Sequence, residues 1–457
     1  MHHDINTLSS YVLRSCLSMI LPVVFVICCS EPAAAQDLAY YYRLAQTNDQ
    51  KLQADLERYQ AAEHPLKQAY AKFLPQASAE GKQTYTEQEV LESDNKVFDV
   101  DKTDYDVSEY TISMTQPLFQ YEYYAGLKKA QAALKQAGTE LASSREDLIM
   151  RVTNAYLEAL AAGDNLRFVR AERAAVSAQH ELTDARFQMG LVPITDFHDV
   201  QARLSLVEAE EAEAENFLDD ALEALREISA EPVFETLSTL KKDIPLDMPE
   251  PVDVDIWMKK ARNQGLQVRI AADAMVVAQR EIDVQTAGHL PVLEAFAEHN
   301  WTDSGSTLYG GGSEINTTEF GLQVSMSLFE GGAVISRTRE ARHRYLAARK
   351  DLELEARGAE RSARTAFLGI KSAIRRVDAL KQSVASQQLA LQARQEGFKS
   401  GLFTSIDVLD AERDLYQAQK DFSRARYDYA LNRLKLKQAV GTLEQDDLME
   451  INSWLIQ

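Results

Sequence analysis

Beyond residue 29 the 457-residue sequence has no cysteine, because Cys16, Cys28 and Cys29 are its only three. A chain of this length without disulfides must be stabilised by packing or by assembly. The sequence also lacks an excess of basic residues: 49 Lys and Arg stand against 70 Asp and Glu, a formal net charge of −21. This balance argues against nucleic acid and anionic membrane surfaces as partners.

Long hydrophobic runs are absent except at the start of the chain. Residues 16–29 form an apolar stretch, with Arg14 before it and the small residues Ala33 to Ala35 after it. This pattern predicts a signal peptide over residues 1–35 and a mature chain from Gln36. The stretch is shorter than the roughly 20 residues of a membrane-spanning anchor, and no lipoprotein-type lead precedes a cysteine. Since no apolar run of about 18 residues follows, any membrane crossing is expected to use a closed β-barrel.

Proline is missing from two long stretches, between Pro117 and Pro193 and everywhere after Pro291. Both stretches can therefore form uninterrupted helices. Small or apolar residues recur at alternating steps of three and four, for example over residues 352–384, which predicts an alanine-rich coiled-coil seam. A helix over residues 121–189 would extend roughly 100 Å at about 1.5 Å per residue.

The sequence repeats itself at a period of about 210 residues, which indicates a duplicated domain. The echoed segments are Leu74-Pro75 with Leu290-Pro291, Leu118-Phe119 with Leu328-Phe329, and Phe187 to Leu191 with Phe398 to Leu402. We predict two structural repeats of a helix, a β-hairpin and long helices. The first repeat is expected over 36–230, with its hairpin at about 76–119 and its long helices at about 121–230. The second is expected over 254–440, with its hairpin at about 292–329 and its long helices at about 333–440; residues 231–253 link the repeats, and residues 441–457 follow the second.

Strict alternation marks the clearest strand, residues 318–328, in which every second residue from Phe320 to Leu328 is apolar. An apolar face and a polar face over about ten residues are typical of a transmembrane barrel strand. A soluble sheet with one wet face is the alternative. Long loops are expected between the strands of each pair: an acidic one over 87–106 and a Gly- and Ser-rich one over 303–317.

Four strands per chain cannot close a barrel, since about eight are the minimum that enclose side chains. Open strand edges cannot persist in lipid, so several chains must pool their strands: two would give about eight and three about twelve. The long helices are too polar for lipid and must project into an aqueous compartment. A barrel continued by a helical tube is a conduit.

Three segments resemble the TolC family of outer-membrane efflux proteins. Residues 187–196 and 400–410 are similar to the family's two helix-turn-helix tips, and residues 432–443 are similar to its C-terminal region. The resemblance covers essentially the whole mature chain. It implies a mainly α homotrimer in the outer membrane, in which a trans-periplasmic α-helical barrel continues into a 12-stranded β-barrel. The linker 231–253 and the segment 441–457 would form an equatorial belt.

The resemblance also implies partners and cargo. The duct would dock on a periplasmic adaptor (membrane fusion protein) and an inner-membrane pump of RND or ABC type, and would open at its periplasmic tip. Its cargo would be drugs, toxic small molecules or secreted proteins, in efflux, type I secretion or both. Outer-membrane lipid would surround the barrel. The lipid-anchored branch of the family is disfavoured because the mature chain has no cysteine.

Asp407 and Asp410 match the acidic pair that lines the family's periplasmic constriction. They are three residues apart, so one helical face presents both. In a trimer the crowded carboxylates would raise one another's pKa and attract cations. A simpler interpretation is that Asp407 belongs to a capping box with Thr404.

Gly190 and Gly401 are expected to end long helices in the left-handed conformation. With Leu191 and Leu402 they would form the tips that contact the adaptor.

The family's closed state is held by a Tyr and an Arg near the second tip, which bond to a Thr-Asp pair near the first. Thr195 and Asp196 match the acceptors, whereas Phe398 and Phe403 stand where the donors would be. Phenylalanine donates no hydrogen bond. Either other contacts, such as apolar packing of the two phenylalanines, hold the closed state, or that state is weaker.

The sequence predicts no catalytic cluster, metal site or cofactor site. Its histidines have no ligand spacing, and Gly310-Gly-Gly-Ser313 lacks the lysine of a phosphate-binding loop. A trimeric coiled-coil surface adhesin would not explain two strand pairs in a duplicated chain. A secreted enzyme would need a polar cluster in a pocket.

Overall fold

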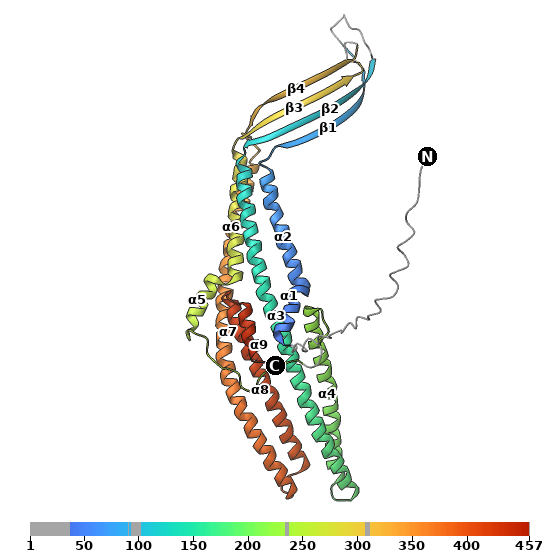
Figure 1. Cartoon of the computed structure of the whole chain (residues 1–457), viewed down its shortest axis with the longest axis vertical. Helices are drawn as coiled ribbons and strands as arrows, with labels where there is room; N and C mark the ends of the chain where they lie inside the picture. The colour runs from blue at the N-terminus through green and yellow to red at the C-terminus, as the bar shows by residue number, and fades with distance from the viewer. Residues whose placement is uncertain (1–36, 90, 93–101, 234–236, 307–310, 457) are drawn as a thin grey trace, which may run out of the picture. The chain divides into compact units, whose positions relative to one another are not determined.

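The computed structural model describes residues 37–89, 91–92, 102–233, 237–306 and 311–456. The predicted signal peptide and the centres of both predicted loops lie outside these ranges. Two series of elements follow one another in the same order (Figure 1). The first is α1 (Leu38–Asn48), α2 (Gln50–Ala71), β1 (Gln76–Glu89), β2 (Lys102–Phe119), α3 (Tyr121–Gln188) and α4 (Ile194–Ser229). The second is α5 (Val254–Gln264), α6 (Leu266–Thr286), η1 (Ala287–His289), β3 (Val292–Ser304), β4 (Ser313–Ser325), α7 (Ala333–Lys399) and α8 (Ser405–Ala439), after which α9 (Gln445–Ser453) follows.

Two helices dominate the chain: α3 with 68 residues and α7 with 67. Neither contains proline, so no backbone hydrogen bond is interrupted along them. Within the described ranges, no helix combines the length and the apolarity that a membrane crossing requires.

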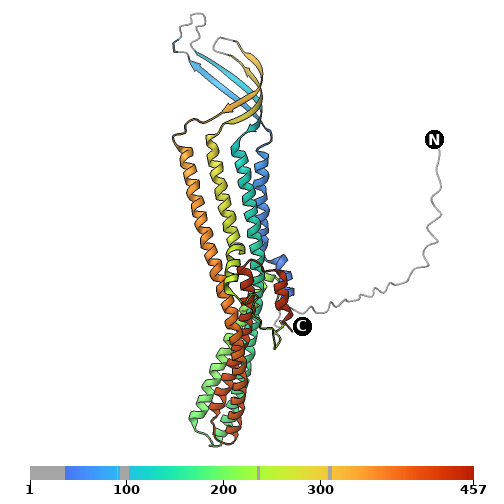
Figure 2. The same cartoon turned by 90° about the vertical axis from the view of Figure 1, so that its left-hand side faces the viewer.

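Shorter helices stack end to end beside these two. Next to the sheet, α7, α6, α3 and α2 lie side by side (Figure 2), whereas toward the far tips α3 packs on α4 and α8, and α7 on α8. Asn48, the last residue of α1, donates its side-chain N–H to the carbonyl of Ser229 at the end of α4, at 2.9 Å. The turn that follows α8 lies closer still to the junction of α5 and α6, since a Cβ on Gly441 would lie 2.6 Å from the carbonyl oxygen of Gln264, the last residue of α5. Only glycine allows this approach.

The main core lies where these helix ends meet. Tyr41, Tyr156, Tyr427 and Tyr429 are among its fully buried side chains. Burial of a tyrosine requires a partner for its hydroxyl, and the linker supplies two: Tyr156 donates to the carbonyl of Ser238 at 2.9 Å, and Tyr429 to that of Asp247 at 3.0 Å. The Trp454 ring of the C-terminal segment stacks on that of Tyr429 at 6.0 Å. The linker and the C-terminal segment therefore both contact the long helices at this level, which we call the belt.

The four strands form one antiparallel sheet in the order β1-β2-β3-β4. In the register, Tyr110 on β2 opposes Gly81 on β1 and Trp301 on β3, and its ring stacks on the Trp301 ring at 5.3 Å. Side chains alternate between faces. One face carries apolar side chains, among them Tyr110, Ile112, Met114, Leu293, Ala295, Phe320, Leu322 and Val324. The other carries mostly polar ones, among them Ser78, Glu80, Lys82, Glu109, Thr111, Ser113, Glu298 and Glu319.

The strand limits differ from the predicted ones. The alternating pattern extends to Leu328, but pairing of β4 ends at Ser325, opposite Val292 at the start of β3. The preceding Pro291 has no N–H to continue the ladder. Conversely, the strands reach into the predicted loops: β1 runs to Glu89 and β2 starts at Lys102, so both ends of the acidic segment 87–106 are paired strand. Backbone pairing does not depend on an apolar face, which is why the pattern misplaced these ends.

Candidate functional site: the tips of the two helical hairpins

The turns at the far ends of the long helices have the same backbone geometry. Gly190 and Gly401 adopt φ of +72° and +77°. In the first turn the N–H of Leu191 donates to the carbonyl of Arg186 at 2.9 Å, and that of Gly190 to Phe187 at 2.8 Å. The second turn repeats both bonds, from Leu402 to Gly397 at 2.8 Å and from Gly401 to Phe398 at 3.1 Å. This is the Schellman motif, in which the left-handed residue is glycine because a Cβ would be strained there.

Apolar side chains protrude from both turns. Leu191 is 68% exposed and Leu402 is 79% exposed. Met189 and Ile194 are also largely exposed beside the first turn. Apolar groups at a free end are typical of surfaces that contact a partner.

The predicted constriction residues lie in the first turns of α8. Thr404 and Asp407 form a capping box: the Asp407 N–H donates to the Thr404 hydroxyl oxygen at 3.2 Å, and the Thr404 N–H donates to the Asp407 carboxylate at 2.8 Å. Hydrogen bonds from the Thr404 side chain and backbone hold the pKa of Asp407 below its ordinary value. Asp410 pairs with Arg413 at 3.4 Å. The capping interpretation of Asp407 is therefore correct, and the rise in pKa expected of an assembled ring stays a prediction.

The four predicted latch residues do not form one cluster. Thr195 donates to its neighbour Asp196, at 3.4 Å. Phe403 folds back on its own hairpin, where a Cβ added to Gly397 would lie 2.4 Å from its ring. Phe398 packs against a buried cluster of α7 and α8 in its own hairpin and also contacts the other hairpin.

The residue that meets Phe398 is Arg186, in the last turn of α3. Its guanidinium carbon lies 5.0 Å from the centroid of the Phe398 ring, a cation–π contact. We call this pair the tip contact. The sequence alone does not identify Arg186 as a site residue. A basic residue in the last turn of a helix is already explained by the helix dipole. The spacing of residues along α3 does not indicate which aromatic ring of the other hairpin Arg186 contacts.

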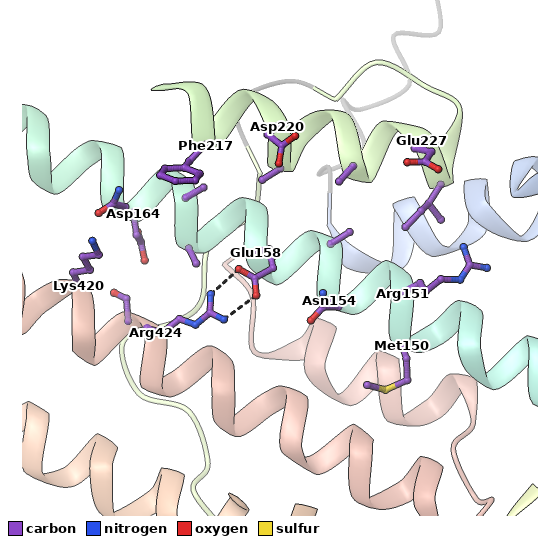
Figure 3. Close-up of a pocket in the computed structure, with 18 of the residues that line it drawn as sticks. Met150, Arg151, Asn154, Glu158, Asp164, Phe217, Asp220, Glu227, Lys420 and Arg424 are labelled. Atoms are coloured by element: carbon purple, nitrogen blue, oxygen red, sulfur yellow. Dashed lines mark hydrogen bonds and ion pairs between the residues drawn. The ribbon is translucent and has the colours of Figure 1, made fainter. Parts of the chain in front are cut away.

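Closer to the belt, the hairpins are joined by hydrogen bonds. Arg424 on α8 binds Glu158 on α3 through both nitrogens, at 2.6 and 2.8 Å (Figure 3). The hydroxyl of Tyr427 donates to Asp164 at 2.8 Å. A groove of about 930 Å³ lies over this region, lined by α3, α4 and α8.

From Asp164 to the tips, no hydrogen bond or ion pair joins the two hairpins within the described ranges. Leu409 of α8 packs with Val176 of α3 and Val200 and Val207 of α4. Beside this cluster lie two carboxyls, Glu172 and Glu412, whose pKa values are raised by burial and, for Glu412, also by the charge of Glu172.

The described residues contain no group of three or more His, Cys, Asp or Glu side chains that could hold a metal ion.

Comparison with known proteins identifies the family of this chain. The sequence pattern of outer membrane efflux proteins matches residues 41–231 and 257–442. The chain belongs to the outer membrane efflux protein family. The outer membrane protein TolC of Vibrio cholerae is 34% identical, over 92% of this chain and 94% of its own length. The alkaline protease secretion protein AprF of Pseudomonas aeruginosa is 28% identical, over 93% and 88%. The structure of the CmeC outer membrane channel of Campylobacter jejuni has a TM-score of 0.76 at 16% identity, over 91% of this chain and 89% of that one.

As an efflux family member, the chain is an outer-membrane channel with a helical part in the periplasm, and the predicted fold and location are confirmed. Members of this family are channels for efflux and secretion rather than enzymes. The hairpin tips are thus the part of an outer-membrane channel that lies farthest from its sheet along α3 and α7.

Proposed function

We propose that three copies of this chain form one duct, gated at the hairpin tips, that exports cargo without transforming it. The outer edges of β1 and β4 have no partner strand among the described residues, and pairing β4 of one copy with β1 of the next would close a 12-stranded barrel. A signal peptide over residues 1–35 would direct the chain out of the cytoplasm.

One observation carries the gate proposal: the decline in contacts between the hairpins from the belt to the tips. The bidentate Arg424–Glu158 pair anchors α8 to α3. Farther out, the contact consists of the Leu409 cluster and the tip contact. Apolar packing and a single cation–π contact separate at lower cost than bidentate charge-assisted hydrogen bonds, so the outer part of each hairpin is the part free to swing.

Asp407 and Asp410 would narrow the closed end of the duct. Thr195, Asp196, Phe398 and Phe403 lie in or beside the moving turns and would change partners as the tips separate. Gly190, Leu191, Gly401 and Leu402 would dock on a periplasmic adaptor, which connects the duct to an inner-membrane pump of RND or ABC type. The two leucines support this docking role because most of their apolar surface is exposed in the described chain.

Protein secretion is a second use of the same duct. AprF is described as an alkaline protease secretion protein, so a type I secretion role stands beside the efflux role. The geometry of one chain favours neither cargo.

The experiment is single-channel recording from purified trimers in a planar bilayer, with the reversal potential measured in a salt gradient. We expect a small, cation-selective conductance. In the Asp407→Ala/Asp410→Ala variant, six carboxylates leave the constriction, and cation selectivity should fall severalfold because charged rings set selectivity in narrow pores. Unchanged selectivity would remove these residues from the constriction, and the absence of any conductance from assembled wild-type trimers would contradict the duct itself.

A further inference from the structure

Aromatic and cationic side chains gather where the helices of the first repeat meet the sheet. The Lys72 Nζ lies 5.3 Å from the centroid of the Tyr123 ring, and the Lys128 Nζ lies 5.5 Å from that of Tyr124. Phe73 meets Tyr123 edge-on, with the ring centroids 6.2 Å apart. We call these five residues the junction cluster.

Both ammonium groups are available to a ligand. Neither forms a hydrogen bond or an ion pair with any described residue, whereas the adjacent Lys129 pairs with Glu281 at 2.7 Å. A ring face attracts an ammonium group electrostatically without using its three N–H donors. Lys72 is exposed and Lys128 is half-buried, next to Tyr124, which is 51% exposed, so both ammonium groups lie at or near the surface.

The cluster adjoins the apolar face of the sheet. Gln116 lies two residues after Met114 and four after Ile112 on β2, so its side chain is on the same face of the sheet. Its amide donates to the backbone carbonyl of Phe73 at 2.8 Å. The cluster thus forms a rim at the helix-side edge of the surface that would contact lipid.

The second repeat lacks this cluster. From the echo of Leu74 in Leu290, Lys72 corresponds to Gly288, and from the echo of Leu118 in Leu328, Lys128 corresponds to Thr338. On the same basis Tyr123 and Tyr124 correspond to Ala333 and Val334. The cluster is therefore a feature of one repeat and not a requirement of the shared fold.

We propose that the junction cluster binds the phosphate headgroup of an anionic phospholipid in the membrane leaflet next to the helices. The aromatic rings would lie at the depth of the headgroups, as aromatic residues do at membrane interfaces, and the two ammonium groups would bind the phosphate oxygens. The inference rests on the proposed placement of the sheet in the membrane. The net charge of −21 disfavours general attraction to anionic surfaces, so binding would be confined to this rim.

The test is native mass spectrometry of detergent-solubilised trimers, titrated with phosphatidylglycerol or with zwitterionic phosphatidylcholine. The wild type should retain phosphatidylglycerol in preference to phosphatidylcholine. Lys72→Gln/Lys128→Gln should weaken that binding on the order of tenfold or more, given the attraction of a basic residue near an anionic surface. Lys72→Arg/Lys128→Arg should retain it, because the charge remains.

The matched control is Lys242→Gln/Lys371→Gln, which removes two exposed lysines away from the junction and should leave the preference intact. An unchanged preference in the Lys72/Lys128 glutamine variant, or an equal loss in the control, would overturn the proposal. Abolition of the preference by inorganic phosphate at constant ionic strength would also overturn it, in favour of a free-phosphate site. Conductance of the same preparations reports on the duct separately, so loss of lipid binding with normal conductance leaves the proposed function standing.

Discussion

The two hairpin tips share a backbone turn but differ in how the returning helix begins. In the first tip α4 starts after Pro193 with no side-chain cap, and the Phe197 ring stacks on that of Phe187 at 5.6 Å. In the second tip α8 starts at the Thr404 capping box, and Phe403 covers Gly397.

This difference shows that a helical tip has two separate requirements: the chain must reverse its direction, and the start of the next helix must be fixed. Reversing the chain requires glycine at the left-handed position, and both repeats keep it. Fixing the start of the next helix can be done by hydrogen bonds to its free N–H groups or by packing of side chains beside them. The first tip uses aromatic packing and the second uses hydrogen bonds, so matched substitutions should have unequal effects.

The largest effect is expected from a charge on the protruding leucines. Leu402→Asp should reduce export to background, because about 2 kcal/mol of apolar burial would be lost in each copy if the adaptor covers this side chain. Leu191→Asp should have a smaller effect, since Leu191 is less exposed. The measurement is the rate of dye efflux in cells that lack the native channel, with trimers verified on unboiled gels.

The control is Val252→Asp, which places the same charge on an exposed apolar residue of the linker. Normal efflux by the Leu402 variant would remove this tip from the docking surface. Equal losses in both leucine variants would indicate that the adaptor does not distinguish the tips.

A smaller effect is expected where the tips meet. Arg186→Gln removes the cation from the tip contact, whose two side chains are half-buried, and such a contact contributes between about 0.5 and about 2 kcal/mol, depending on how far it is desolvated. The open state should then be populated severalfold more, which would appear as longer or larger openings in single-channel records. Phe398→Leu should have the same effect, whereas Phe398→Tyr should preserve closure because its ring still attracts a cation.

Arg173→Gln is the matched control, because Arg173 lies on the same helix but pairs with Glu211 of its own hairpin at 3.3 Å. If gating changes as much in this variant as in Arg186→Gln, the effect comes from net charge and not from the tip contact.

The sequence predicts the fold well because its strongest signals are periodic. The proline-free stretch from Tyr121 leads to one helix that ends at Gln188, and Gly190 and Gly401 identify the turns before any coordinates are known. The site is only partly predictable, because contacts between hairpins depend on how two helices are rotated against each other. Arg186 and Phe398 are 212 positions apart, and no local pattern pairs them.

The smallest effect is expected from the cap that distinguishes the second tip. Thr404→Ala removes the hydroxyl that accepts from the Asp407 N–H, a loss of about 1 kcal/mol for a typical cap. Hydrogen exchange in the first turn of α8 should accelerate about fivefold. In the reverse direction, Pro193→Ser supplies a cap in the first tip and should slow exchange at the start of α4. If Thr404→Ala leaves exchange unchanged, the second tip is held by Phe403 packing and the contrast with the first tip disappears.

Acid should weaken the cap at the start of α8, and so reduce the difference between the two tips, without any substitution. Because the pKa of Asp407 is lowered in the folded chain, the stabilisation by its carboxylate is fully present above the unfolded value and is lost as the pH falls through the folded value. Exchange at the start of α8, corrected for its intrinsic pH dependence, should therefore rise in this acidic window. Thr404→Ala should show a smaller rise, because part of the bonding that lowers the pKa is already gone. A pH response of equal size in wild type and variant would show that the hydroxyl of Thr404 contributes nothing to the charge state of Asp407.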